Sequence, residues 1–206
     1  MTWWTPQLWR ADLNLACYEL LIGLVFMASP PADLRDWARH RPTQAELKSK
    51  LAPFAEAFDL LGEGPRFMQD LEELKGEIFS PDLLFLDSAG ENTASKNADL
   101  MVRRSRYQEL DLGLAAMAIY ALQQFAKSGG PGHRTSMRGG GPLVTLANPG
   151  TGIWDLIWAN VPFGQPASIS DLPWMKPCRT SEGSVVVHDS DMPPVEAFFG
   201  MPWRLK

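Results

Sequence analysis

The sequence has few of the residues that carry metal or nucleophilic chemistry. Its 206 residues include 2 cysteines, Cys17 and Cys178, and 3 scattered histidines, His40, His133 and His188. Two distant cysteines form neither a disulfide framework nor a metal-ligand pattern. The motifs H-E-x-x-H, C-x-x-C and G-x-S-x-G are also absent. We therefore expect no enzymatic activity, no bound metal and no cofactor.

Signals for a membrane or for export are lacking too. The longest apolar stretch, "LACYELLIGLVFMAS", contains Glu19 and is shorter than the ~20 residues that a membrane span needs. It predicts a core helix. The first residues, "MTWWTPQLWR", do not have the basic, apolar and small-residue order of a secretory signal. These absences place the protein in the cytoplasm, with no membrane partner.

The size and the periodicity of the chain predict one domain over residues 1–206 with an α+β fold. Helical spacing or capping patterns occur at 12–28, 32–40, 43–61, 111–126 and 152–161, with Thr43 and Glu46 as a capping box and Asp111 as a cap. Short strand-like runs begin at "DLLFL" and cover "PLVTLAN" and "GSVVVHD". We expect mixed helices and short strands joined by long loops.

Charge is distributed unevenly along a chain whose net charge is −5. Residues 103–138 contain six Lys or Arg and two acids, so this part is locally positive in an acidic protein. An acidic body with one basic face is typical of a site for a polyanion. Simple solvation of these charges explains the composition equally well.

A glycine-rich stretch, "KSGGPGHRTSMRGGGP", lies inside this basic part of the chain. It has neither the spacing of a P-loop nor that of a dinucleotide-binding turn. Glycine allows a backbone to approach another molecule closely, and a thin, basic segment suits the narrow, negative minor groove of DNA. The alternative is a surface loop without a ligand.

Four segments carry a resemblance to a known family: "FMQD", "NADLMVRR", "SMRGGGPLVTL" and "EAFFGMPWR". With the sequence around them, over roughly residues 12–206, the chain closely resembles the large subunit of Cascade, the type I-E CRISPR surveillance complex. The resemblance implies an RNA-guided complex in which base pairing reads the target and protein reads a short flanking motif, the PAM. It also implies no enzyme chemistry for this subunit, which serves antiviral defence.

The resemblance implies two binding segments and several partners. The family's glycine loop, which enters the minor groove at the PAM, corresponds to Gly129, Gly130, Pro131, Gly132 and His133, flanked by Arg134 and Arg138. A second loop, 87–97, corresponds to the family's contact with the 5′ handle of the guide RNA and the PAM-proximal region, through Phe85, Leu86, Asp87, Ser88, Gly90 and Asn92. The implied partners are double-stranded DNA, the guide RNA, the other Cascade subunits and the CRISPR helicase-nuclease.

The chain also departs from the family pattern. Family members continue into a C-terminal helical bundle, and their lysine finger and glutamine wedge belong to regions beyond Lys206, so the sequence resembles the N-terminal portion alone. A second hypothesis follows. The chain is a truncated remnant that keeps the fold and acts as a structural or docking piece without DNA affinity.

Overall fold

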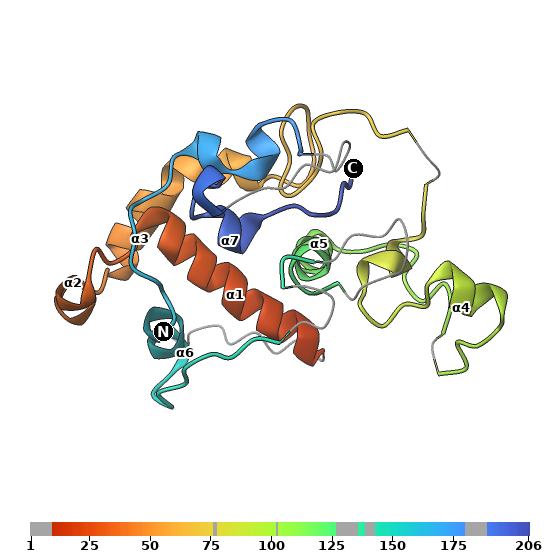
Figure 1. Cartoon of the computed structure of the whole chain (residues 1–206), viewed down its shortest axis with the longest axis horizontal. Helices are drawn as coiled ribbons and strands as arrows, with labels where there is room; N and C mark the ends of the chain where they lie inside the picture. The colour runs from red at the N-terminus through yellow and green to blue at the C-terminus, as the bar shows by residue number, and fades with distance from the viewer. Residues whose placement is uncertain (1–9, 76–77, 102, 127–135, 139–142, 180–188) are drawn as a thin grey trace.

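Helices joined by long connections make up the regular structure of the chain (Figure 1). The computed structural model describes residues 10–75, 78–101, 103–126, 136–138, 143–179 and 189–206. The elements are, in chain order, α1 (Ala11–Ala28), α2 (Leu34–Arg39), α3 (Gln44–Leu51), η1 (Ala52–Phe58), η2 (Pro81–Leu84), α4 (Glu91–Ser95), α5 (Leu112–Phe125), α6 (Ile153–Ala159), η3 (Ile169–Asp171), η4 (Pro173–Met175), η6 (Asp189–Asp191) and α7 (Glu196–Phe199), where η marks a 3-10 helix.

Helix α1 is the central element, and the other helices are arranged around it (Figure 1). It packs against α3, α5, α6 and α7. By length and composition α1 is, in the described part of the chain, the single helix apolar enough to cross a membrane, yet 56% of it is buried inside the protein. The expectation of a core helix in this stretch is therefore confirmed.

The core is rich in aromatic side chains, which accounts for much of the aromatic content of the sequence. Trp174 and Phe199 are fully buried, and their ring centroids lie 5.8 Å apart in an edge-to-face arrangement. Phe58 and Phe67 complete the cluster, with centroids 5.4 Å and 5.2 Å from Trp174. Such pairs add to the stability gained from apolar burial and fix the side chains relative to one another. The cluster ties α7 and η4 to η1.

The predicted capping residues act at the positions expected from the sequence. The Thr43 hydroxyl accepts from the Glu46 N–H at 3.3 Å, and the Glu46 carboxylate accepts from the Thr43 N–H at 2.8 Å, which is a complete capping box for α3. Asp111 accepts from the Leu114 N–H at 2.9 Å and caps α5. These local patterns are confirmed.

The predicted α+β fold class is wrong, because the fold is helical. Among the described residues, β structure is limited to an isolated bridge at Ser136. The apolar run after Pro81 forms the 3-10 helix η2 instead of a strand, and residues 143–148 have no regular structure. The third expected strand falls mainly on residues 180–188, which lie outside the described part, and η6 follows it.

Local hydrogen bonds explain why the two described runs are not strands. Pro81 stands in the first turn of η2, the Ser80 hydroxyl accepts from the Asp82 N–H at 3.3 Å, and Leu83 N–H donates to the Ser80 carbonyl at 3.0 Å. Farther along, the side chain of Asn160 pairs with both the N–H and the carbonyl of Ala147, each at 2.8 Å. A side chain takes the place of a neighbouring strand there. Alternating apolar residues favour a strand only where a partner strand is present.

Candidate nucleic-acid interface

The last turn of α5 holds both ends of the predicted DNA-binding segment. Ala126 closes the helix by donating to the Leu122 carbonyl at 3.0 Å. The chain returns to this turn where the N–H groups of Met137 and Arg138 donate to the carbonyls of Gln123 and Gln124, at 2.9 Å and 3.1 Å. Gly129, Gly130, Pro131, Gly132, His133 and Arg134 lie between these anchors, outside the described residues. The structure thus fixes where the segment leaves the helix and where it returns.

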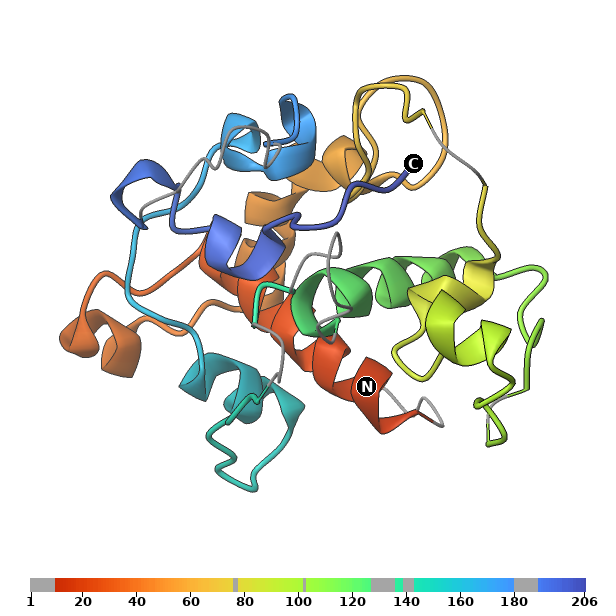
Figure 2. The same cartoon turned by 45° about the vertical axis from the view of Figure 1, so that its right-hand side comes forward.

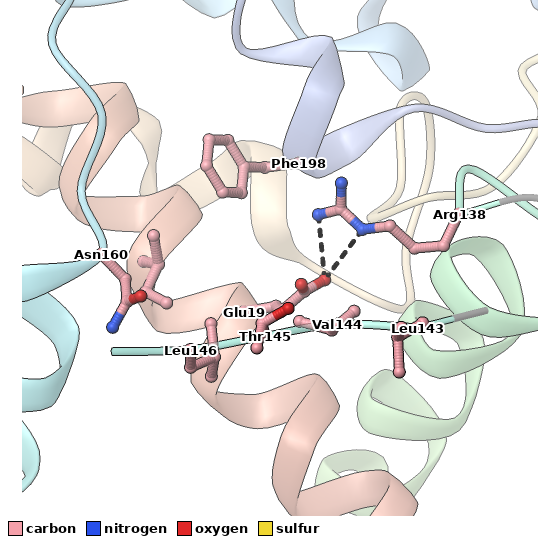
Figure 3. Close-up of a pocket in the computed structure, with 9 residues that line it drawn as sticks. Glu19, Arg138, Leu143, Val144, Thr145, Leu146, Asn160 and Phe198 are labelled. Carbon is pink, nitrogen blue, oxygen red and sulfur yellow. Dashed lines mark hydrogen bonds and ion pairs between the residues drawn. The ribbon is translucent and has the colours of Figure 1, made fainter. Parts of the chain in front are cut away.

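Arg138, a predicted flank of the DNA site, forms an ion pair inside the protein (Figure 3). Its Nη2 and Nε donate to one carboxylate oxygen of Glu19 at 3.0 Å and 3.4 Å. The Glu19 residue is 4% exposed and belongs to the apolar central helix α1. A buried carboxylate needs such a partner, because an unpaired charge in an apolar interior is costly. In this structure Arg138 therefore anchors the end of the segment to α1.

A hollow of about 290 Å³ lies beside this ion pair. Figure 3 shows that Leu143, Val144, Thr145 and Leu146 cross one side of it, with Asn160 and Phe198 on other sides. Residues 143–146, which follow the glycine-rich stretch, therefore lie next to α1. The hollow therefore lies at the place where Arg138 anchors the segment to α1.

The "EAFFGMPWR" motif packs directly on the returning chain. A Cβ on Gly200 would overlap the thioether of Met137 and would lie 2.9 Å from the carbonyl oxygen of Glu196. Glycine is therefore required by close approach at this position. The contact links α7 to Met137, in the described stretch 136–138 that follows the glycine segment (residues 129–134).

Two buried glutamines in α5 bind the C-terminal part of the chain. Gln123 donates to the Trp203 carbonyl at 2.8 Å and accepts from the Trp203 N–H at 2.9 Å. Gln124 donates to the carbonyl of Phe198 at 2.9 Å. Both glutamines are fully buried, so these bonds are shielded from water. Figure 2 shows the C-terminal chain running along this end of α5.

The "FMQD" motif joins the same assembly through Asp70. Its N–H donates to the Leu205 carbonyl at 2.7 Å, and its carboxylate pairs with Arg204. Burial opposes ionisation of Asp70, but the bonds from Arg204 and from the Glu72 N–H outweigh it and lower the pKa of this carboxyl. Segments carrying the resemblance, near residues 70, 137 and 200, thus meet around one end of α5.

The residues predicted for the guide-RNA loop divide into buried and exposed groups. Phe85 is 3% exposed and stacks on Tyr107, with ring centroids 4.0 Å apart. Asp87 accepts from Arg10 and from Arg106, each at 2.8 Å, and these bonds lower its pKa although burial opposes them. Contacts of this kind hold the loop in place.

The remaining loop residues differ in exposure. The Ser88 hydroxyl donates to the Asp82 carbonyl, and Leu86 is half-buried. Gly90 and Asn92 are exposed at the start of α4. The exposed residues of the predicted site are therefore Asp87, Gly90 and Asn92, and of these Asp87 is already held by two arginines.

Exposed cations near this loop were not assigned to a site by sequence reasoning. Lys96 and Arg103 are exposed and form no ion pair within the described residues, whereas Arg104 pairs with Asp99. The run of arginines at 103–106 was visible in the sequence as positive charge. Only the fold shows that Arg103 is the member of this run without an ion pair among the described residues, because Arg104 and Arg106 are both paired.

The two predicted segments lie at opposite ends of α5. The η2 and α4 region adjoins the first turn of α5, and the glycine segment is anchored at its last turn (Figure 2). A helix of this length separates its ends by roughly 20 Å. The structure therefore gives two separate candidate surfaces.

The described residues provide no metal centre or activated thiol. Among them no group of three or more His, Cys, Asp or Glu side chains is placed to hold a metal ion. Burial raises the pKa of Cys17, and burial followed by the charge of Asp70 raises the pKa of Cys178 to about 11. Neither cysteine is a ready nucleophile at neutral pH.

Comparison with known proteins identifies the family. The profile of the family described as CRISPR-associated protein Cse1 matches residues 2–206, which is nearly the whole chain. A comparison with curated protein sequences returned no match. Cse1 proteins are structural subunits of Cascade and are not known enzymes. The chain belongs to the Cse1 family, the large subunit of the type I-E CRISPR Cascade complex, where it associates with other Cascade components.

Proposed function

We propose that this chain binds duplex DNA and reads the PAM for the cytoplasmic Cascade complex, using the segment Gly129–His133. One observation carries the proposal: both ends of the segment are held at the last turn of α5, the leaving end by the bond from Ala126 N–H to the Leu122 carbonyl at 3.0 Å and the returning end by the bonds of Met137 and Arg138 at 2.9 Å and 3.1 Å. When both ends of a loop are already held, less conformational entropy is lost as the loop becomes ordered on a ligand.

The chemistry of the segment suits the minor groove. Its glycines allow close approach of the backbone, and Lys127 and Arg134 supply positive charge. Arg138 is engaged with Glu19 and is not counted among the phosphate contacts. The proposed site thus relies on two cations and on main-chain contacts.

We also propose that the loop at residues 87–97, which contains α4 and is here called the α4 loop, docks on the 5′ handle of the guide RNA. Asn92 offers hydrogen bonds to the RNA, Gly90 allows close approach, and Lys96 and Arg103 offer charge without a competing ion pair in the described structure. Phe85 supports the loop from inside the protein, and the exposed Asp87 ties it to Arg10 and Arg106. We also propose that the chain helps to recruit the CRISPR helicase-nuclease, a role that its resemblance to the family supports.

A salt titration of duplex binding tests the DNA proposal. If Lys127 and Arg134 each neutralise one phosphate, log affinity falls with log salt with a slope of roughly −2. Exchange of Gly130 and Gly132 for leucine should weaken binding to PAM-bearing duplex about tenfold and leave the unfolding midpoint unchanged.

The control is Ala45→Leu, because Ala45 is exposed on α3 and belongs to no proposed contact. The unsubstituted chain should prefer PAM-bearing over PAM-free duplex. Absence of salt-dependent binding would support the alternative, a docking piece without DNA affinity.

A further inference from the structure

An open apolar groove of about 740 Å³ lies between α1, α3, η1 and α6. Aliphatic and aromatic side chains from all four elements form most of its walls. They are joined by two polar residues of α3, and the described residues of the lining are Leu24, Gln44, Leu47, Lys48, Leu51, Ala52, Phe54, Ala55, Phe58 and Trp154. Neither the ion pair of Arg138 nor the α4 loop takes part in this surface.

Helix α3 is only partly covered by the rest of the protein. It has no fully buried residue, although Leu47 and Leu51 are one turn apart and face the groove. Phe58 and Trp154 are likewise half-buried in its walls. Apolar side chains that share an open concave surface are typical of a protein-binding site.

The groove carries one free positive charge. Among the described residues that line the groove, Lys48 is the single charged one, and it forms no ion pair with any of the residues that the structure describes. The nearby cations are engaged, because Lys50 donates to the Ser29 hydroxyl at 2.9 Å and Arg41 pairs with Asp155. A carboxylate on the occupant would therefore complement Lys48.

The apolar lining and the small charge of the groove favour one class of binding partner over the others. An apolar groove with one lysine is unsuited to a nucleic acid, which needs many cations. A second copy of a chain with a net charge of −5 would be repelled at long range. The family associates with other Cascade components, which leaves a polypeptide of that complex.

We propose that the groove binds an amphipathic helix of another protein subunit of Cascade. Its apolar side chains, spaced three and four residues apart, would enter between α3 and α6, and an Asp or Glu would lie opposite Lys48. This inference rests on family membership and is independent of DNA binding by the glycine segment.

The test measures binding of the full chain to the remaining Cascade subunits assembled on guide RNA. Ala55→Glu places a carboxylate in the groove and should weaken binding about tenfold or more, because a charge would be buried against apolar groups. Lys48→Glu should weaken it about fivefold through repulsion of the partner's carboxylate.

The matched control is Ser49→Glu, which adds the same charge to an exposed position of α3 outside the groove, next to Lys48 in sequence but not facing it on the helix. It should change the affinity by less than about twofold. Far-ultraviolet circular dichroism checks that all three variants fold. An undiminished affinity of Ala55→Glu, an equal loss in Ser49→Glu, or no binding by the unsubstituted chain would overturn the proposal.

Photo-crosslinking identifies the occupant directly. With p-benzoylphenylalanine at position 55 in the assembled complex, a crosslink to an apolar, acid-containing helix of another subunit supports the proposal. A crosslink to guide RNA, to a second copy or to the same chain contradicts it, and so does the absence of any crosslink.

Discussion

At the scale of single residues, the ion pair of Glu19 and Arg138 changes the role that is assigned to Arg138. In the sequence Arg138 is one of several cations beside a glycine-rich stretch, and it resembles a phosphate contact. In the structure its guanidinium lies 3.0 Å from a carboxylate that is almost completely buried. The same residue thus anchors the segment to the core.

A double-mutant cycle tests this role of Arg138. Arg138→Met should reduce the free energy of unfolding by about 2 kcal/mol, because it leaves the Glu19 carboxylate buried and unpaired. The pair Glu19→Gln with Arg138→Met should recover much of that loss. Urea unfolding measures both values. Arg35→Met, at an exposed position, is the control, and an equal loss there would contradict the anchoring role.

Gly200 supports a second prediction at the residue scale. Gly200→Ala should destabilise the protein by about 2 kcal/mol, since the new methyl group overlaps Met137 and crowds the Glu196 carbonyl. Met137→Ala should be less harmful in the Gly200→Ala background than alone, because it removes one of the two clashes. Thermal unfolding of the four proteins gives this coupling, and strictly additive effects would show that the contact is unimportant.

At the scale of elements, α5 positions both candidate surfaces. Its first turn adjoins the η2 and α4 region, and its last turn holds both ends of the glycine segment (Figure 2). Two of its buried glutamines also bind the backbone of the C-terminal chain. Loss of α5 would therefore disturb three parts of the molecule together.

The cap of α5 provides the prediction at this scale. Asp111→Ala removes the acceptor of the Leu114 N–H and should lower stability by about 1 kcal/mol. Asp111→Asn keeps an acceptor oxygen and should lower the free energy of unfolding by only a few tenths of 1 kcal/mol. Chemical unfolding followed by circular dichroism measures the difference, and equal losses for the two variants would show that the cap is not the cause.

At the scale of the whole molecule, distant parts of the sequence are joined around Asp70, α5 and α7. The Asp70 residue is 2% exposed and pairs with Arg204, 134 positions away. Because the folded-state pKa of Asp70 lies below its ordinary value of 3.8, this carboxylate stabilises the fold above that pH. The contribution is lost as the pH falls through the lowered pKa.

A pH series tests this long-range link. At pH 7, Asp70→Asn should lower the free energy of unfolding by about 2 kcal/mol, and the difference from the unsubstituted protein should shrink below about pH 4. Asp59→Asn, at an exposed position, is the control and should lower the free energy of unfolding at pH 7 by less than about 0.5 kcal/mol. A constant difference between Asp70→Asn and the unsubstituted protein down to pH 3 would contradict the assignment.

Local sequence signals determined several elements of this protein by themselves. The periodicity of α1 and α5, the capping box of Thr43 and Glu46, and the cap at Asp111 depend on residues within a few positions of one another. The family was also recognisable from short motifs, and the family profile confirmed it.

Only the tertiary structure decided which strand-like runs become strands and which charged residues are free. The runs after Pro81 and around Val144 have no partner strand among the described residues, and local bonds and the Asn160 side chain satisfy their backbone instead. Arg138 is neutralised by Glu19, which is 119 residues away. Pairing of strands and of charges depends on neighbours in space, and a linear pattern does not contain those neighbours.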